Sequence, residues 1–338
     1  MKNTTNILRR TLLPAGLLGL SVNALAATAT TCTAAGSCIV FGSSVSVTST
    51  YDQTKYPVVL AHGMTGFSNI GPVDYWYGIP TNMMQNGANV YITSVSAFQS
   101  SEYRGEQLLN QVKTILAISG AKKVNLIGHS HGNQSIRYVA GVLPGGVASA
   151  TSVSGPTKGS AVADLIKSAS DLPVIGSPLT SALTSVVNGF GALVGLGQGQ
   201  SLTQDSLAGL TSLTTAGATA FNGKFPGGVP VTACGEGAYS ANGVRFYSWG
   251  GTGLLTHPLD PIDYALTLTG LAFVGKADSQ NDGLVSRCSN HFGQVIRDNY
   301  AMNHLDTVNQ IFGLVNIFET NPVAVYRTHL NRLKLAGL

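Results

Sequence analysis

A serine near the middle of the chain has the neighbours that a nucleophile needs. Residues 128–132 match the pattern Gly-x-Ser-x-Gly, in which a strained strand-to-helix turn exposes a serine hydroxyl. The mostly apolar run 124–127 before it is typical of a buried strand, and the residues from 133 onward can continue as a helix. Because 41 of the 338 residues are glycine, the five residues alone are a weak signal, and it is this setting that favours the motif. We expect Ser130 to be the nucleophile of an acyl-transfer reaction.

A serine nucleophile needs a base that takes its proton and an acid that orients the base. In folds that use this motif, the acid and then the base follow the serine along the chain. Four histidines follow the motif, at positions 257, 291, 304 and 329. Their order and spacing alone do not choose among them.

Strands and helices alternate around the motif. A buried strand that runs into a Gly-containing loop is predicted within 56–64, and further strands within 89–93, 147–153 and 244–249. Apolar residues at helical spacing predict a helix over 104–118. Such alternation is typical of an α/β fold with a mostly parallel central sheet and helices on both faces. We find no repeat and no linker rich in proline or charge, so residues 27–338 are expected to form a single domain.

The first 26 residues predict a secretory signal peptide. Lys2, Arg9 and Arg10 precede the apolar stretch 12–25, and Ala24-Leu25-Ala26 is a small-x-small cleavage signature. The apolar stretch is too short for a transmembrane anchor and is interrupted by Pro and Gly. The protein is therefore expected to be secreted to the extracellular medium.

The charge content of the chain is low. The formal net charge of +4 includes three cations of the signal peptide, which leaves +4 − 3 = +1 for the mature chain. Charged residues make up 10% of the sequence, against roughly 25% in an average soluble domain. No basic patch with interleaved aromatic residues is present, so nucleic acid is not an expected partner. A surface poor in charge suits an exported protein that meets an apolar phase.

Four cysteines in an exported chain predict two disulfides. Cys32 and Cys38 are close in sequence and would close a small loop near the mature N-terminus. Cys234 and Cys288 would then pair across a long loop. The other pairings stay open at this point.

A long stretch without charge, 172–204, carries apolar residues at helical spacing and several glycines. One interpretation is a helix of the core. The other is a mobile helical lid with an apolar inner face, and the glycines favour it because they weaken a static helix.

The chain resembles the Pseudomonas-type bacterial triacylglycerol lipases, calcium-binding, foldase-dependent enzymes with the α/β-hydrolase fold. The likeness covers nearly the whole mature chain. It rests on residues 59–64, 73–76, 104–109, 128–132, 234–237, 281–285, 296–300, 302–306 and 309–314.

This resemblance implies a complete hydrolytic site. Ser130 would be the nucleophile, Asp282 the acid and His304 the base. The backbone N–H groups of Met64 and His131 would form the oxyanion hole, which agrees with the donors expected next to such a motif.

The resemblance also implies one structural Ca²⁺ near the base. Its ligands would be the carboxylates of Asp260 and Asp306 and the backbone oxygens of Gln310 and Leu314. Oxygen ligands suit this hard cation. Because Asp306 lies two residues after His304, the ion would pin the loop that carries the base.

The family disulfide corresponds to Cys234 and Cys288, whereas Cys32 and Cys38 depart from the usual pattern of one disulfide. A lipase-specific foldase is implied as a folding partner. The expected function is hydrolysis of long-chain triacylglycerol at a lipid–water interface. The alternative is a secreted carboxylesterase that acts on short soluble esters, since it would share every catalytic residue.

Overall fold

The computed structural model describes residues 26–33, 36–64, 66, 69–70, 73–170 and 202–338. The predicted signal peptide up to residue 25 lies outside the described residues, as does the predicted lid up to residue 201. In the described ranges, no helix has the length and apolar character needed to cross a membrane.

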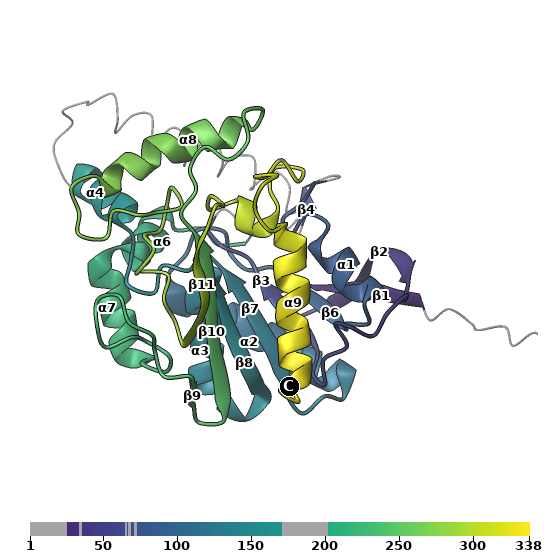
Figure 1. Ribbon diagram of the computed structural model, residues 1–338. Helices are drawn as coiled ribbons and strands as arrows, with labels where there is room; N and C mark the ends of the chain where they lie inside the picture. Colours follow the sequence, from purple (N-terminus) through teal and green to yellow (C-terminus); the bar gives the residue numbers. More distant parts are fainter. Residues whose placement is uncertain (1–25, 34–35, 65, 67–68, 71–72, 171–201) are drawn as a thin grey trace, which may run out of the picture.

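A nine-stranded, mostly parallel sheet forms the centre of the molecule, with the strand order β11-β10-β8-β7-β3-β6-β1-β2 and β9 paired to β10 (Figure 1). Only β2 and β9 pair antiparallel to their neighbours among the described strands of this sheet. A separate hairpin consists of β4 (Asn69–Ile70) and β5 (Val73–Asp74). The strands of the main sheet are β1 (Ala26–Cys32), β2 (Cys38–Ser46), β3 (Val58–Ala61), β6 (Val90–Thr93), β7 (Val124–His129), β8 (Val147–Val153), β9 (Ser240–Ala241), β10 (Val244–Gly251) and β11 (Gln294–Tyr300).

Helices cover both faces of the sheet, as the sequence predicts. α1 (Ile79–Gln85) and α9 (Pro322–Leu335) contribute Met83 and Tyr326 to the hydrophobic core of one face. α2 (Ser101–Ser119) and α3 (Gly132–Val142) contribute Leu108 and Ile136 to the core of the other. Figure 1 shows α9 in front of the sheet and α2 and α3 behind it. The predicted arrangement of a mostly parallel sheet between two helical layers is confirmed.

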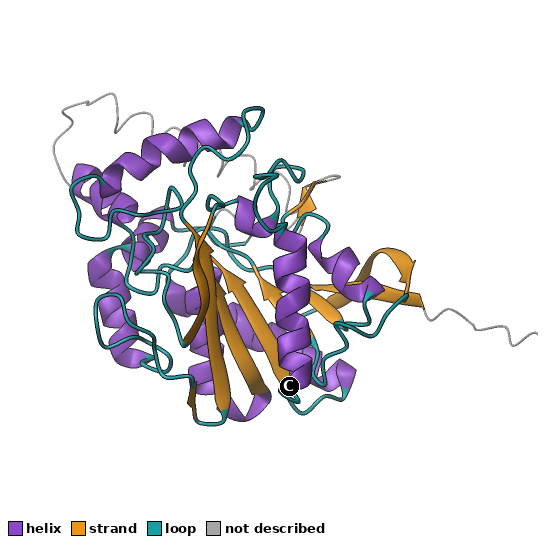
Figure 2. Ribbon diagram, in the orientation of Figure 1, coloured by secondary structure: helices purple, strands orange, loops and turns teal. Residues whose placement is uncertain are grey.

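The remaining helices gather beside and above the sheet in Figure 2, with α8 across the top. They are α4 (Ala161–Ser170), α6 (Ser206–Leu213), α7 (Thr215–Lys224) and α8 (Pro261–Gly270). Three short 3₁₀ turns complete the described structure: η1 (Pro144–Gly146), η2 (Leu271–Phe273) and η3 (Asp306–Val308). Long loops between these elements carry the residues of the candidate site.

Candidate active site

Ser130 stands at a sharp turn between β7 and α3. Its backbone φ of 54° lies in the left-handed region, which is strained for a residue other than glycine. A Cβ atom at Gly128 would collide with the backbone of Gly132, and one at Gly132 would collide with the carbonyl oxygen of Ala61. Both glycines are therefore required by close backbone approach. The turn leaves Ser130 partly exposed, although its neighbour His129 is fully buried.

Asp282 and His304 form a buried pair. The Nδ1 atom of His304 lies 2.9 Å from Oδ2 of Asp282, and each residue is at most 2% exposed. The other carboxylate oxygen of Asp282 accepts hydrogen bonds from the backbone N–H groups of Leu284 (3.0 Å) and Val285 (2.8 Å). Because the carboxylate accepts the Nδ1–H of the ring, Nε2 is left free to take a proton.

The structure separates the four histidines that the sequence leaves as candidates. His304 alone contacts Asp282 in the described part of the chain. Both ring nitrogens of His291 are hydrogen-bonded next to the Cys234–Cys288 disulfide. His329 is buried on α9, and His257 accepts a backbone N–H in the loop before α8. These three are structural residues by their contacts.

His304, the predicted base, adjoins the turn of Ser130, but the two side chains are not joined by a hydrogen bond. The Ser130 hydroxyl makes no hydrogen bond to another of the described residues. His304 instead reaches the turn through His129, whose Nε2–H donates to the His304 carbonyl oxygen at 3.0 Å. The two rings lie 4.8 Å apart. Catalytic hydrogen bonds are often long before substrate binds, so this geometry is compatible with proton transfer.

The loop after β3 passes directly against the nucleophile. A Cβ atom at Gly63 would lie 2.7 Å from the Cβ of Ser130. The fully buried guanidinium of Arg104 holds this loop, since Nη2 donates to the carbonyl oxygens of His62 (2.7 Å) and Gly63 (3.0 Å). Burial lowers the pKa of Arg104 to about 9, which leaves it protonated at neutral pH.

Two backbone N–H groups beside Ser130 are available for a ligand. They belong to Met64 and His131, the predicted oxyanion donors, and neither donates a hydrogen bond within the described residues. His131 also precedes the first residue of α3, where the helix dipole favours negative charge. The arrangement can stabilise an oxyanion next to the Ser130 hydroxyl.

The histidines around the nucleophile are neutral. Burial and the charge of Arg104 lower the pKa of His62 to about 3. Burial likewise holds the pKa values of His129 and His131 well below the ordinary value of a histidine. At neutral pH these three rings therefore carry no positive charge, and the imidazolium formed at His304 during the reaction is not repelled by them.

Buried carboxylates adjoin His304, the predicted base. Asp306 is fully buried, and its Oδ2 accepts the backbone N–H of Asn303 at 2.9 Å, whereas its Oδ1 has no hydrogen-bond partner. Burial, together with the charges of Asp263 and Asp260, raises the pKa of Asp306 to about 7. Asp260 is 1% exposed, and neither Asp260 nor Asp306 forms an ion pair with another described residue. An unpaired buried carboxylate is costly unless a cation neutralises it.

The other two predicted calcium ligands lie on the same loop. In the described structure, the carbonyl oxygens of Gln310 and Leu314 accept no hydrogen bond. The backbone N–H of Ile311 donates to Asp260 Oδ2 at 3.2 Å, so this loop meets the start of α8. Among the described residues, no three His, Cys, Asp or Glu side chains form a metal-binding group. The predicted set has only two such side chains, because its other ligands are backbone oxygens.

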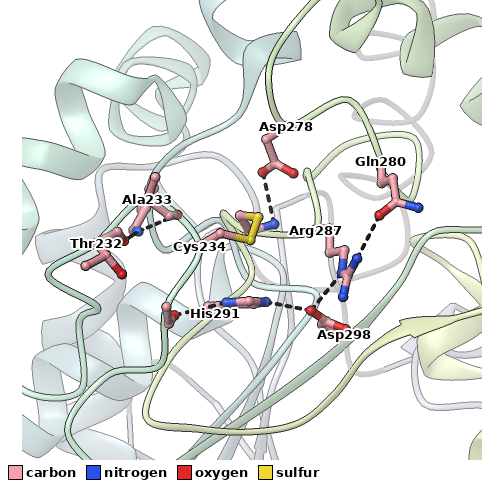
Figure 3. Close-up of a disulfide and its surroundings, with 11 residues drawn as sticks. Thr232, Ala233, Cys234, Asp278, Gln280, Arg287, His291 and Asp298 are labelled. Carbon is pink, nitrogen blue, oxygen red and sulfur yellow. Dashed lines mark hydrogen bonds and ion pairs between the residues drawn. A yellow bond between two sulfur atoms is a disulfide. The ribbon is translucent and has the colours of Figure 1, made fainter.

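Two disulfides brace the structure. Cys32–Cys38 joins β1 to β2, and Cys234–Cys288 spans 54 residues with a Cα–Cα distance of 4.6 Å. Figure 3 shows the second bond beside Asp278, which accepts the backbone N–H of Cys288 at 2.9 Å. The bond therefore tethers the segment that follows Asp282.

Two supporting residues escape analysis of the sequence. Arg104 belongs to the stretch 104–109 that resembles the family, and Asp263 belongs to no such stretch, but both are fully buried charged residues. Asp263 accepts the side-chain N–H of Asn303 at 2.5 Å and thereby links α8 to the loop of the base. A charged residue on the buried face of an amphipathic helix is the signal that could have found both.

Comparisons with known proteins agree with this geometry. A family model for the alpha/beta hydrolase fold matches residues 56–308. A protein from Vibrio cholerae named triacylglycerol lipase is 53% identical over 289 residues, which cover 85% of this chain and 90% of that protein. A triacylglycerol lipase from Pseudomonas fragi is 40% identical, with 85% of this chain and 98% of the relative covered.

Solved structures show the same fold at low sequence identity. A Bacillus licheniformis lipase in its mature form has a TM-score of 0.57 and 16% identity, covering 83% of this chain and 93% of that one. A metagenomic carboxyl esterase has a TM-score of 0.54 and 14% identity, with coverage of 84% and 78%. At such identities the likeness concerns the fold alone.

Proposed function

The chain belongs to the bacterial triacylglycerol lipases of the α/β-hydrolase fold, and we propose that it hydrolyses the ester bonds of long-chain acylglycerols. The observation that carries the proposal is the buried pair of Asp282 and His304 beside the strained turn of Ser130. Asp282 fixes the tautomer of His304 that a general base needs.

The reaction proceeds in two acyl-transfer steps. His304 Nε2 takes the proton of the Ser130 hydroxyl as its oxygen attacks the ester carbonyl carbon. Asp282 stabilises the imidazolium that forms, and the N–H groups of Met64 and His131 stabilise the oxyanion by about 3 kcal/mol each. The imidazolium then protonates the departing alcohol. Water, activated by the same histidine, cleaves the acyl-enzyme and restores Ser130.

We propose that one Ca²⁺ stabilises the base loop. Asp260 and Asp306 would hold it through carboxylates, and Gln310 and Leu314 through backbone oxygens. The buried, unpartnered Oδ1 of Asp306 and the absence of a cationic partner for either carboxylate in the described structure support this set. When bound, the ion neutralises the clustered carboxylates and ties the loop that contains His304 to the start of α8.

We also propose that the protein is secreted. The cleavable N-terminal segment predicted from the sequence supports export, and so do the two disulfides, because such bonds persist in oxidising compartments. A lipase-specific foldase would assist folding during export. The lipid–water interface is the proposed site of action.

Hydrolysis rates measured across the solubility limit of the ester test the proposed substrate. A short-chain and a long-chain ester should be compared at rising concentration. A lipase gives its highest rate on the long-chain ester after an emulsion forms. Saturation below the solubility limit, with the short-chain ester preferred, would instead support a carboxylesterase.

A further inference from the structure

Three hydrogen bonds in series join the loop after β3 to the backbone of the base. The backbone N–H of Gly63 donates to the Tyr75 hydroxyl oxygen at 3.0 Å. That oxygen lies 2.5 Å from Nδ1 of His129, and Nε2 of the same histidine lies 3.0 Å from the carbonyl oxygen of His304. The two linking side chains are 5% and 0% exposed, so water does not compete for these bonds.

The direction of every proton in this series follows from the end groups. The His304 carbonyl oxygen can only accept, so Nε2 of His129 carries the ring proton. Nδ1 is then an acceptor, and the Tyr75 hydroxyl donates to it. Burial raises the pKa of Tyr75 and lowers that of His129, so both stay neutral and the pattern persists at neutral pH.

The series connects the two halves of the catalytic apparatus. Gly63 immediately precedes Met64, whose N–H is a proposed oxyanion donor, and it lies against the Cβ of Ser130. His304 is the proposed base. The two loops are more than 200 residues apart in the sequence, and His129 adjoins the nucleophile between them.

We infer that Tyr75 and His129 form a positioning relay that holds the oxyanion donor and the base in register around Ser130. The inference rests on the proposed hydrolytic function, in which both residues would position catalytic groups. Their printed bonds end on the backbones of Gly63 and His304, so both would act as positioning residues. A shift of about 1 Å at reacting groups can lower a rate by about a hundredfold, so loss of the relay should reduce turnover.

Tyr75→Phe is the first test, because it keeps the ring and removes only the hydroxyl. We expect kcat for a soluble short-chain ester to fall about tenfold to a hundredfold. KM should stay within about twofold, since the change affects the transition state rather than substrate binding. Rates are expressed per active site titrated with an organophosphonate, which removes any misfolded fraction from the comparison.

Tyr77→Phe is the matched control. Tyr77 lies two residues further along the chain, and its hydroxyl makes no hydrogen bond within the described structure; its ring packs on Phe312. Its kcat should equal that of the wild type. A Tyr75→Phe variant as fast as this control would overturn the relay.

Two changes at His129 separate positioning from packing. His129→Gln keeps one donor and one acceptor and should restore most of kcat, whereas His129→Phe keeps the ring but neither group and should be as slow as Tyr75→Phe. The double variant Tyr75→Phe, His129→Phe should be no slower than the slower single variant, because the second change acts on a relay already broken. Equal rates for Gln and Phe at position 129, or effects that multiply in the double variant, would contradict the proposal. If Tyr75→Phe does not fold, the two His129 variants decide alone.

Ser130→Ala distinguishes failure of the relay from failure of the function. Loss of activity in that variant, together with an unaffected Tyr75→Phe, would reject the relay and leave the hydrolytic proposal intact. Wild-type activity of Ser130→Ala would reject the hydrolytic proposal and the relay with it.

Discussion

Asp282 and His304 are joined twice, once through their side chains and once through their backbones. The carboxylate Oδ2 lies 2.9 Å from the imidazole Nδ1, and the backbone N–H of His304 donates to the Asp282 carbonyl oxygen at 2.8 Å. The second bond fixes the spacing of the two loops independently of the state of the imidazole. The pair is thus preorganised before substrate arrives, which reduces reorganisation during proton transfer.

Asp282→Asn should abolish most of the activity and leave the fold intact. The amide oxygen of Asn can still accept the N–H groups of Leu284 and Val285. Its amide N–H₂, however, favours the wrong tautomer of His304, which in a comparable serine hydrolase lowers kcat by about 10⁴. Steady-state kinetics and a thermal melt check this outcome. Retained activity would contradict the assignment of Asp282 as the acid. So would a loss of activity accompanied by a lower melting temperature, because the loss could then reflect unfolding.

Removal of calcium should lower the melting temperature and accelerate thermal inactivation. A ligand that binds only the native state adds about 2.7 kcal/mol at a hundred times its dissociation constant. Asp260→Asn should reproduce the effect and become insensitive to chelator. This change keeps the side-chain oxygen that caps α8 through the N–H of Ile262, so loss of the helix cap does not confuse the result. If the wild-type protein kept its melting temperature after its metal was removed, the proposed calcium site would be wrong.

Asp52, which is not a residue of the candidate active site, should make the stability of the protein depend on pH. It is fully buried, neither carboxylate oxygen has a hydrogen-bond partner among the described residues, and burial raises its pKa from 3.8 to about 7 despite Arg327 and Lys334. A pKa raised by folding favours the native state at low pH. This stability is complete below about pH 4 and is lost as the pH rises through about 7.

The variant Asp52→Asn tests this sign. It should melt close to the wild type at pH 4 and several degrees higher at pH 8, since the stability falls by about 1.4 kcal/mol per pH unit between the unfolded and folded pKa values and each kcal/mol corresponds to about 2–4 °C. Melting curves at the two pH values suffice. If the melting temperatures of the variant and the wild type differed by the same amount at both pH values, folding would not change the pKa of Asp52.

The two disulfides should differ in their contribution to stability. In the chain-entropy model, a bond across 54 residues contributes about 4 kcal/mol and one across 6 residues about 2 kcal/mol. Replacing Cys234 and Cys288 by Ala should therefore lower the melting temperature more than replacing Cys32 and Cys38. The reverse order would show that support of the pairing between β1 and β2, rather than closure of a loop, determines how much a disulfide stabilises this protein.

The elements nearest the nucleophile were predictable from sequence because local signals agree there. Residues 124–127 form a mostly apolar, fully buried part of β7, and the predicted helix 104–118 matches α2 within three residues at each end. Ser100 caps that helix by accepting the N–H of Tyr103, and Gly120 ends it at a φ of 65°. Caps of this kind explain the small differences at its ends.

Other features depend on contacts that the sequence does not display. β1 has the sequence AATATTC without an apolar run, and it becomes a strand because it pairs with the open edge of β6, with Thr30 opposite Tyr91. The bonds of Tyr75 and His129 likewise join segments that only the fold brings together. The proposed acid and base were predicted only through resemblance to the family, because the order and spacing of the histidines do not choose among them.

Trapping of the nucleophile tests the central claim most directly. The wild-type protein should be incubated with an organophosphonate ester and its peptides mapped by mass spectrometry. We predict one phosphonyl group per chain, on the peptide that contains Ser130, with parallel loss of esterase activity and no adduct on Ser130→Ala. An adduct on another residue, or a Ser130→Ala variant that still hydrolyses esters at the wild-type rate, would contradict catalysis by Ser130.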